Sequence, residues 1–193
     1  MLYFKKAETL IDDSTDKITR KVIYKAIGIL YSNMKNYQEA IRYKELEAPY
    51  VKEIDGIDLY AKHLLDWATD CRILNQMEKA KYLCKQVEEI LPQLSNINIV
   101  SYYLNYGLLE IEMGNYDNAV SLLTKGISCS TEGNGKETSL LPYLYNHIGR
   151  AYMFKKDYSN ALINLKKSAD IQMQINGSVS EKTQSYIKEC ESK

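Results

Sequence analysis

The sequence predicts an all-α fold of stacked antiparallel helix pairs, and three observations support it. A frame that runs from a small residue to an alanine twelve positions later recurs four times, at Gly28–Ala40, Ala68–Ala80, Gly107–Ala119 and Gly149–Ala161. The frames start 40, 39 and 42 residues apart. Apolar residues flank each frame at helical spacing, and turn residues divide it in two. Self-similarity at this period is typical of helical repeat proteins.

The fourth unit shows how each frame divides into two helices. Its first stripe is Tyr145, Ile148, Gly149 and Tyr152, at spacings that place them on one helix face. A turn is predicted at Lys155-Lys156-Asp157, and a second stripe follows at Tyr158, Ala161, Leu162, Leu165 and Ser168. The first and third units repeat this pattern. The second unit is the most divergent, with Leu64, Trp67, Ala68 and Cys71 before Met77, Ala80, Leu83 and Cys84.

Close helix packing explains the small residues and most of the tyrosines. Two antiparallel helices cross tightly only where one of them carries no bulky side chain, and a large ring then fills the neighbouring groove. Many of the seventeen tyrosines recur at equivalent places, such as Tyr24, Tyr103 and Tyr145. We therefore assign most tyrosines to packing rather than to a binding site.

Composition excludes several classes of function. Twenty-five basic residues balance twenty-five acidic ones, and only four of the basic residues are arginines, so no broad positive field predicts nucleic-acid binding. No apolar run approaches the length of a membrane span, and charge at Lys5-Lys6 interrupts any signal peptide.

Cys71 and Cys84 are expected to be buried thiols, with a disulfide between them as the alternative. A cytoplasmic location is the expectation.

Two strings then resemble a known repeat family. Asn146-His147-Ile148-Gly149-Arg150-Ala151-Tyr152 with Tyr158-Ser159-Asn160-Ala161, and Tyr106-Gly107 with Gly114-Asn115-Tyr116-Asp117-Asn118-Ala119, are similar to the tetratricopeptide repeat (TPR). The resemblance covers about residues 17–175, although the second unit lacks the glycine and the tyrosine. It implies a right-handed α-solenoid, the TPR superhelix. The long period resembles the repeats of kinesin light chains and of bacterial peptide-sensing regulators of the Rap type.

The period also predicts the boundaries of the repeats. We expect one solenoid over 1–193, with four full repeats at about 17–53, 58–92, 98–131 and 139–175 and a half repeat at each end. The amino-terminal half repeat, 1–13, would use Phe4, Ala7 and Leu10 as the last turns of a helix; the terminal helix would cover about 180–191. The residues beyond the family's usual repeat length are predicted to form loops between repeats, at Lys52–Ile57, Gln93–Asn98, Ser130–Ser139 and Asn176–Glu181. The half repeats suggest a longer array or a homo-oligomer.

No pattern in the chain predicts catalysis. There is no glycine-rich phosphate loop, nucleophile elbow or zinc-protease motif in the sequence. His63 and His147 belong to units two apart and are interpreted as surface or groove residues rather than as metal ligands or general bases. We therefore expect no enzymatic activity, no metal and no cofactor.

The TPR resemblance implies a concave face lined by the first helix of each unit. The residues that it assigns to a peptide-binding groove are Lys25, Lys62, Thr69, Arg72, Tyr143, Asn146 and Arg150. The same face includes Ile29, Ser32, Leu65, Ser101, Leu108, Glu112 and Phe154. Asn146 can pair with a peptide amide, and Arg72 and Arg150 can hold carboxylates in bidentate fashion.

The chain departs from the carboxylate clamp of chaperone-binding TPR proteins. Lys25 fits one clamp position, but Ile29 replaces the asparagine and Asp66 places a negative charge where a neutral donor belongs. A chaperone tail is therefore not the expected ligand. The sequence favours a non-enzymatic module that binds a peptide or a partner helix in the groove. The alternative is a peptide-sensing regulatory domain of a larger signalling or transcription-regulating protein.

Overall fold

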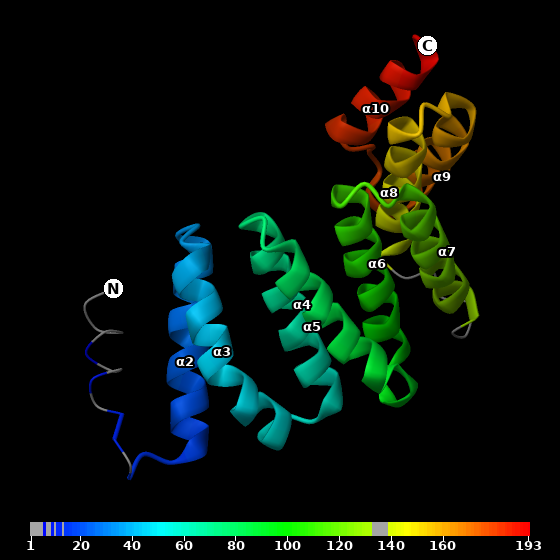
Figure 1. Cartoon of the computed structure of the whole chain (residues 1–193). Helices are drawn as coiled ribbons and strands as arrows, with labels where there is room; N and C mark the ends of the chain where they lie inside the picture. Colours follow the sequence, from blue (N-terminus) through cyan, green and yellow to red (C-terminus); the bar gives the residue numbers. More distant parts are fainter. Residues whose placement is uncertain (1–5, 7–8, 10, 13, 133–138) are drawn as a thin grey trace. The chain divides into compact units, whose positions relative to one another are not determined.

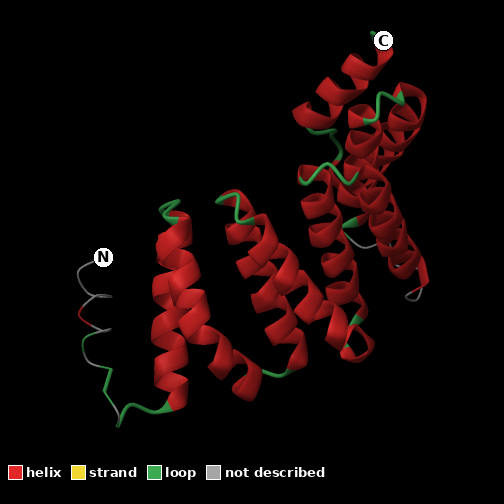
Figure 2. Cartoon of the chain, in the orientation of Figure 1, coloured by secondary structure: helices red, strands yellow, loops and turns green. Residues whose placement is uncertain are grey.

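The computed structural model describes residues 6, 9, 11–12, 14–132 and 139–193. Among these residues all regular secondary structure is helical, and no strand occurs (Figures 1 and 2). The predicted all-α class is therefore confirmed. The chain divides into two compact units, Met1–Leu94 and Ser95–Lys193. From here on these are called the first unit and the second unit, and each single repeat is called a helix pair. The predicted amino-terminal helix positions Phe4, Ala7 and Leu10 lie outside the described residues.

The first unit contains two helix pairs. Helix α2 (Lys17–Asn33) packs against α3 (Tyr37–Ile54), and α4 (Ile57–Ile73) packs against α5 (Met77–Ile90), which continues into the short 3₁₀ helix η1 (Leu91–Gln93). Helix α3 also packs against α4, so the two pairs stack. Within each pair the helices run antiparallel (Figure 1).

The second unit repeats this arrangement and adds one helix. Helix α6 (Asn96–Glu112) pairs with α7 (Tyr116–Glu132), and α8 (Leu141–Phe154) pairs with α9 (Tyr158–Asn176). The pairs stack through α7 and α8, and the last helix, α10 (Glu181–Glu191), packs against α9. Among the described residues, no helix is both long enough and apolar enough to cross a membrane.

The same turn closes all four helix pairs. Lys35, Asn75, Gly114 and Lys156 each adopt a positive φ, between 58° and 80°. In each turn the next residue donates its backbone N–H to the carbonyl five positions back, as Asp157 does to Tyr152 at 2.9 Å. This left-handed C-cap satisfies carbonyls that the end of a helix leaves open. Only Gly114 does so without steric cost to a side chain, so the turn is fixed by its hydrogen bonds rather than by glycine.

The extra residues of the long period lie partly in helices. The sequence predicted a loop at Lys52–Ile57, but α3 continues to Ile54, and Gly56 at φ +81° marks the break. Likewise α7 extends through Glu132. Nothing between Lys52 and Ile54 stops a helix, and α3 also continues through Pro49, which removes one N–H from its hydrogen-bond ladder.

Each unit has its own core built around the predicted frame. In the first unit Ile27, Tyr31, Ala40 and Tyr43 are buried together, and the rings of Tyr31 and Tyr43 stack with centroids 5.7 Å apart. In the second unit the cores gather around Ala119 and Ala161, both fully buried. Cys71 and Cys84 are buried and free, so the disulfide alternative does not hold in this structure.

The frame glycines differ in how much space they leave. A Cβ added to Gly149 would lie 2.6 Å from Cγ of Leu165 and 3.2 Å from the backbone oxygen of Ala161. At Gly107 the nearest atom, Cγ of Leu123, would be 2.5 Å away. At Gly28 the nearest atom, Cβ of Tyr43, would be 3.4 Å away, which is ordinary contact.

We therefore expect Gly149→Ala to lower the free energy of unfolding by about 1–3 kcal/mol through overpacking, although alanine favours helix by about 1 kcal/mol. Gly28→Ala is the matched control and should be neutral or stabilising. Urea unfolding followed by circular dichroism measures both. Equal effects of the two substitutions would contradict the close approach at Gly149.

Candidate functional site

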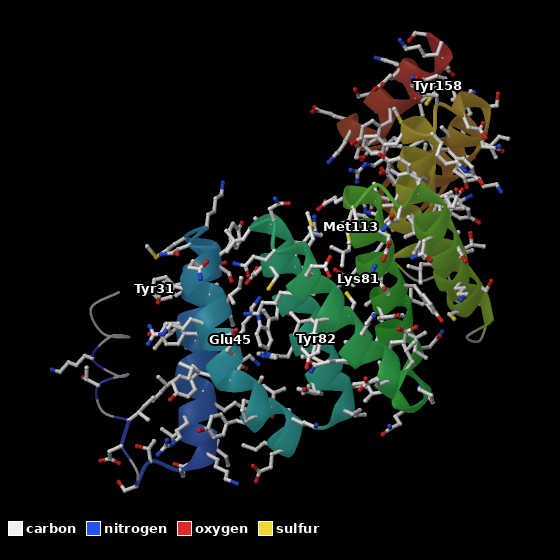
Figure 3. All side chains as sticks on the ribbon, in the orientation of Figure 1. Tyr31, Glu45, Lys81, Tyr82, Met113 and Tyr158 are labelled. Atoms are coloured by element: carbon white, nitrogen blue, oxygen red, sulfur yellow. The ribbon has the colours of Figure 1, made fainter. Side chains whose placement is uncertain are left out.

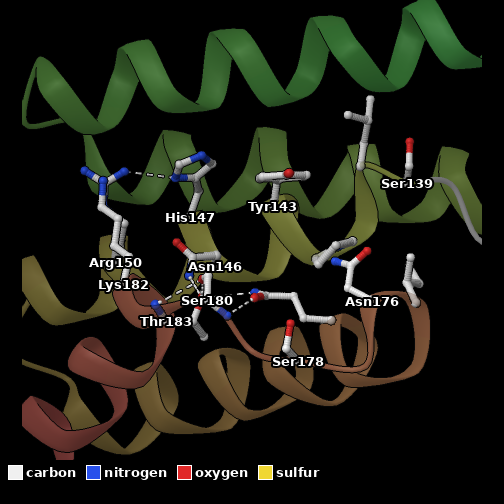
Figure 4. Close-up of a pocket in the computed structure, with 14 residues that line it drawn as sticks. Ser139, Tyr143, Asn146, His147, Arg150, Asn176, Ser178, Ser180, Lys182 and Thr183 are labelled. Atoms are coloured by element: carbon white, nitrogen blue, oxygen red, sulfur yellow. Dashed lines mark hydrogen bonds between the residues drawn. The ribbon is translucent and has the colours of Figure 1, made fainter.

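A pocket of about 660 Å³ lies in the second unit, between α8, α9 and the start of α10 (Figure 4). Helix α8 presents Tyr143, Asn146, His147 and Arg150 along one side. Helix α9 contributes Gln172, Ile175 and Asn176, and the segment that enters α10 contributes Ser178, Ser180, Lys182 and Thr183. The wall formed by α8 is the face that the sequence assigned to the groove.

Three of the seven predicted groove residues meet in this pocket. Tyr143, Asn146 and Arg150 are spaced by three and four positions, so they project from one side of α8. The Tyr143 ring is 57% exposed, which leaves a large aromatic surface open to a ligand. Gly149 of the same helix packs closely against Leu165 and Ala161 of α9, which fixes the rotation of α8.

A polar network centred on Thr183 closes the pocket at α10. The Thr183 side chain is 1% exposed, and its hydroxyl accepts hydrogen bonds from Nδ2 of Asn146 at 2.9 Å and from Nε2 of Gln172 at 3.0 Å. Oγ of Ser180 lies 2.9 Å from the same hydroxyl. Oε1 of Gln172 accepts the Ser180 backbone N–H at 2.8 Å. The network therefore fixes the start of α10 to α8 and α9 (Figure 4).

The network fixes which atom of the Asn146 amide is used inside the protein and which is left for a ligand. Nδ2 is the donor to Thr183, so the oxygen Oδ1 is the atom left for another contact, and no hydrogen bond to it occurs within the part of the chain that the structure describes. A ligand would have to supply an N–H to this oxygen. The predicted donor-and-acceptor role of Asn146 is thus partly used inside the protein.

Arg150 is held in place without a carboxylate. Its Nη1 lies 3.0 Å from Nδ1 of His147, and its guanidinium lies 5.9 Å from the ring centroid of Tyr186 on α10. Because arginine can only donate, Nδ1 of His147 accepts, and the neutral ring carries its proton on Nε2. Across residues 14–132 and 139–193 no acidic side chain pairs with Arg150, so its charge is available to an anionic group.

Gln172, Ser180 and Thr183 were missed from the sequence. Ser180 is the N-cap of α10, and the Ser180-x-x-Thr183 spacing is a readable helix-start signal. The contact of Thr183 with Asn146, 37 positions away, has no local signature.

The other four predicted residues lie in the first unit, and none of them lines the pocket of α8, α9 and α10. Lys25 on α2 and Lys62 on α4 are exposed, and Arg72 near the end of α4 is half-buried. Thr69 bonds its hydroxyl to the carbonyl of Leu65 at 3.0 Å within the same helix. Their role in binding stays a prediction.

Buried charges run between α3 and α4 of the first unit. Nζ of Lys44 lies 2.7 Å from Oδ2 of Asp70, with both side chains largely buried, and it also donates to the backbone oxygen of Asp66 at 2.9 Å. The hydroxyl of Ser32 on α2 also donates a hydrogen bond to Oδ2 of Asp70 at 3.2 Å. Paired in this way, both charges have the partners that burial demands.

His63 is buried against Glu47, which corrects its interpretation as a surface or groove residue. Its Nε2 lies 2.9 Å from the carbonyl of Lys44, so Nε2 carries the proton and Nδ1 presents a lone pair to Oε2 of Glu47 at 3.5 Å. Burial raises the pKa of Glu47 from 4.5 to about 7, against the opposing charge of Lys25. Burial lowers the pKa of His63 from 6.5 to about 4. Both groups are therefore neutral between these values.

Comparison with known proteins supports the repeat assignment. The family model described as "Tetratricopeptide repeat" matches residues 100–129 and 142–172, which are the two helix pairs of the second unit. A search of curated protein sequences finds no significant match.

Several solved structures have a similar fold. RapI in its apo form is 15% identical, with a TM-score of 0.77 over 98% of this chain and 73% of RapI. BtubC (BKLC) from P. vanneervenii is 19% identical, with a TM-score of 0.73 over 92% of this chain and 76% of that protein. TPR-like repeats of a putative kinesin light chain from Podosopora anserina are 15% identical, with a TM-score of 0.70 over 91% of this chain and 84% of that one. These likenesses establish the fold, and the predicted similarity to Rap-type and kinesin-light-chain repeats is confirmed at that level.

The neutral His63–Glu47 pair predicts compensating pH effects. Between pH 4.5 and 7 the folded state keeps a proton on Glu47 that the unfolded chain releases, so this group lowers the free energy of unfolding as pH rises. Between pH 4 and 6.5 the unfolded chain binds a proton on His63 that the folded state lacks, so this group has the opposite effect. Each slope is about 1.4 kcal/mol per pH unit.

Wild type should therefore show a flat stability profile between pH 4.5 and 6.5 from this pair. His63→Gln should lose stability as pH rises across that window, and Glu47→Gln should gain stability. Urea midpoints at half-unit pH steps measure all three proteins. Parallel profiles for the two variants would show that the pair does not carry buried, neutral groups.

Thr183→Val should release the start of α10. Valine keeps the shape but leaves the amides of Asn146 and Gln172 without their shared acceptor, at a cost of about 1–3 kcal/mol. Hydrogen exchange at the α10 amides should quicken while exchange in α8 is unchanged. Ser185→Ala, on the exposed side of α10, is the control. Unchanged protection of α10 in Thr183→Val would refute a docking role for the network.

Proposed function

Because residues 100–129 and 142–172 are tetratricopeptide repeats, we propose that this chain is a non-enzymatic interaction module that binds an extended peptide segment of a partner protein in the pocket of α8, α9 and α10. The observation that carries this proposal is the convergence of Tyr143, Asn146 and Arg150 on one pocket wall. The pocket volume of about 660 Å³ is within the range of specific ligand sites.

The pocket chemistry specifies the peptide. The Tyr143 ring offers flat area for an apolar side chain at low entropic cost. Oδ1 of Asn146 accepts a backbone N–H. The Arg150 guanidinium and the exposed Lys182 favour a carboxylate. We therefore propose an extended segment that carries an acidic side chain or a free carboxyl terminus close to an apolar residue.

A regulatory form of this function is supported by the attachment of α10. The same Asn146 amide that faces the pocket holds Thr183 at the start of α10. A peptide that draws Asn146 away would loosen α10, and a peptide that bridges α8 and α10 would tighten it. This coupling is the feature that favours the peptide-sensing alternative.

The proposal is tested by selecting peptides from a random display library on the full chain and measuring the Kd of the selected peptides by calorimetry. We expect acidic peptides, and we expect Arg150→Glu to weaken their binding by more than about tenfold through loss of a charge-assisted contact. Tyr143→Ser should weaken binding less.

Arg42→Glu, the same charge change on the exposed side of α3, is the matched control and should bind as wild type. Melting temperatures report whether each variant is folded. Selected peptides that bind Arg150→Glu and Arg42→Glu equally well would place the site elsewhere.

A further inference from the structure

A second pocket, of about 280 Å³, lies wholly within the first unit on α3, α4 and α5. Its wall on α3 includes Glu45, Pro49 and Lys52, and its wall on α5 includes Lys79, Tyr82 and Gln86. Tyr60, Leu64 and Trp67 of α4 lie between them. Glu45 and Tyr82 are labelled in Figure 3. None of the predicted groove residues lines this pocket.

Three aromatic residues contribute to the lining. They are Tyr60, Trp67 and Tyr82, and Tyr82 is 61% exposed. Lys52 lies over the Tyr60 ring at 5.6 Å, and Lys79 lies over the Trp67 ring at 5.3 Å. Leu64 and Leu83 are buried and give the pocket a rigid apolar floor. An exposed ring beside a preformed apolar floor is typical of a recognition surface.

The hydroxyls of Tyr60 and Tyr82 are hydrogen-bonding groups of the lining. Nε1 of Trp67 is buried with no hydrogen-bond partner among the described residues, and it is closed off from solvent, so a ligand would contact the Trp67 ring rather than this N–H. The pKa of Tyr60 is raised by burial and by Tyr82, so this phenol keeps its proton. The Tyr82 oxygen accepts from Nε2 of Gln86 at 3.0 Å, which leaves its own hydrogen to donate.

Lys52 gives the lining one positive charge that no acidic side chain balances. Glu45, the one carboxylate of the lining, already pairs with Lys79 through one of its oxygens. Lys52 forms no ion pair among the described residues. The lining also keeps acceptors, in the second oxygen of Glu45 and the amide oxygen of Gln86.

We propose that this pocket binds a proline-rich segment in the polyproline II conformation, with an acidic residue beside it. A prolyl residue has no N–H to satisfy, and its outward carbonyl can accept from the Tyr82 hydroxyl. Its ring packs on aromatic faces, the general basis on which proline-rich segments are recognised. The neighbouring carboxylate pairs with Lys52. A helical ligand would fit poorly, because its backbone carbonyls are already bonded within the helix.

Trp67 provides the measurement, since it is the only tryptophan in the chain. The probes are three peptides with acetylated and amidated ends. The first is hexaproline followed by one aspartate, the second is hexaproline alone, and the third replaces the prolines of the first by alternating glycine and serine. We expect a saturable change in Trp67 emission with the hexaproline-aspartate peptide below about 1 mM. The glycine-serine peptide, of equal length and charge, should give no saturable change.

Three variants locate the contact. Tyr82→Ser should weaken binding of the hexaproline-aspartate peptide by about tenfold through loss of a ring contact. Lys52→Glu should weaken binding of that peptide but leave binding of hexaproline alone unchanged. Ile163→Ser, which removes a similarly exposed apolar side chain from α9 and lines neither pocket, is the matched control and should bind as wild type.

Several outcomes would overturn the proposal. The first is that neither proline peptide gives a saturable change in Trp67 emission. The second is that wild type binds the glycine-serine peptide as tightly as the hexaproline-aspartate peptide. The third is that Tyr82→Ser binds the hexaproline-aspartate peptide as tightly as wild type. An emission change that depends on protein concentration alone would show that a second copy of the chain covers the pocket instead. Because Lys52 is exposed, Lys52→Glu keeps the test decisive if Tyr82→Ser lowers stability.

Discussion

The packing of paired helices around the small-residue frame is the constraint on which the rest of each unit depends, and the approach is closest in the second unit. At Gly107 and Gly149 the space that a Cβ would need is occupied by Leu123 and Leu165, so the partner helix lies against the backbone itself. That contact fixes the rotation of each helix about its axis. Every side chain off the frame is thereby aimed at a neighbouring pair or at solvent. Binding surfaces follow from the packing, because each helix has one face committed to it.

The two units use different polar chemistry to hold successive helices together. In the second unit the neutral side chains of Asn146, Gln172 and Thr183 bond one another and hold α10. In the first unit Lys44 and Asp70 form a buried ion pair, and His63 faces Glu47. Neutral networks are insensitive to pH, whereas buried acids and histidines couple proton uptake to folding. The stability of the first unit therefore depends on pH through His63 and Glu47, whereas the neutral network of the second unit does not add a pH dependence.

The two pockets also differ in what they offer a ligand. The pocket of α8, α9 and α10 combines an arginine that has no acidic partner among the described residues with an amide oxygen and one exposed ring, a mixture suited to an acidic peptide with a free backbone. The pocket of α3, α4 and α5 offers three aromatic side chains and the unpaired charge of Lys52. Both pockets favour a negative charge on the ligand, but they differ in the number of aromatic rings and in the backbone contact that they offer.

The sequence by itself determined the helix pairs, because the frame is a local pattern and helical periodicity is set by neighbours three and four residues apart. It also placed Tyr143, Asn146 and Arg150 on one face of one helix for the same reason. Only the tertiary structure decided that Thr183 occupies the Asn146 amide, that His63 is buried, and that α3 runs on to Ile54. These features depend on contacts between residues 16 to 37 positions apart or on the balance of packing at a helix end, and no local pattern encodes them.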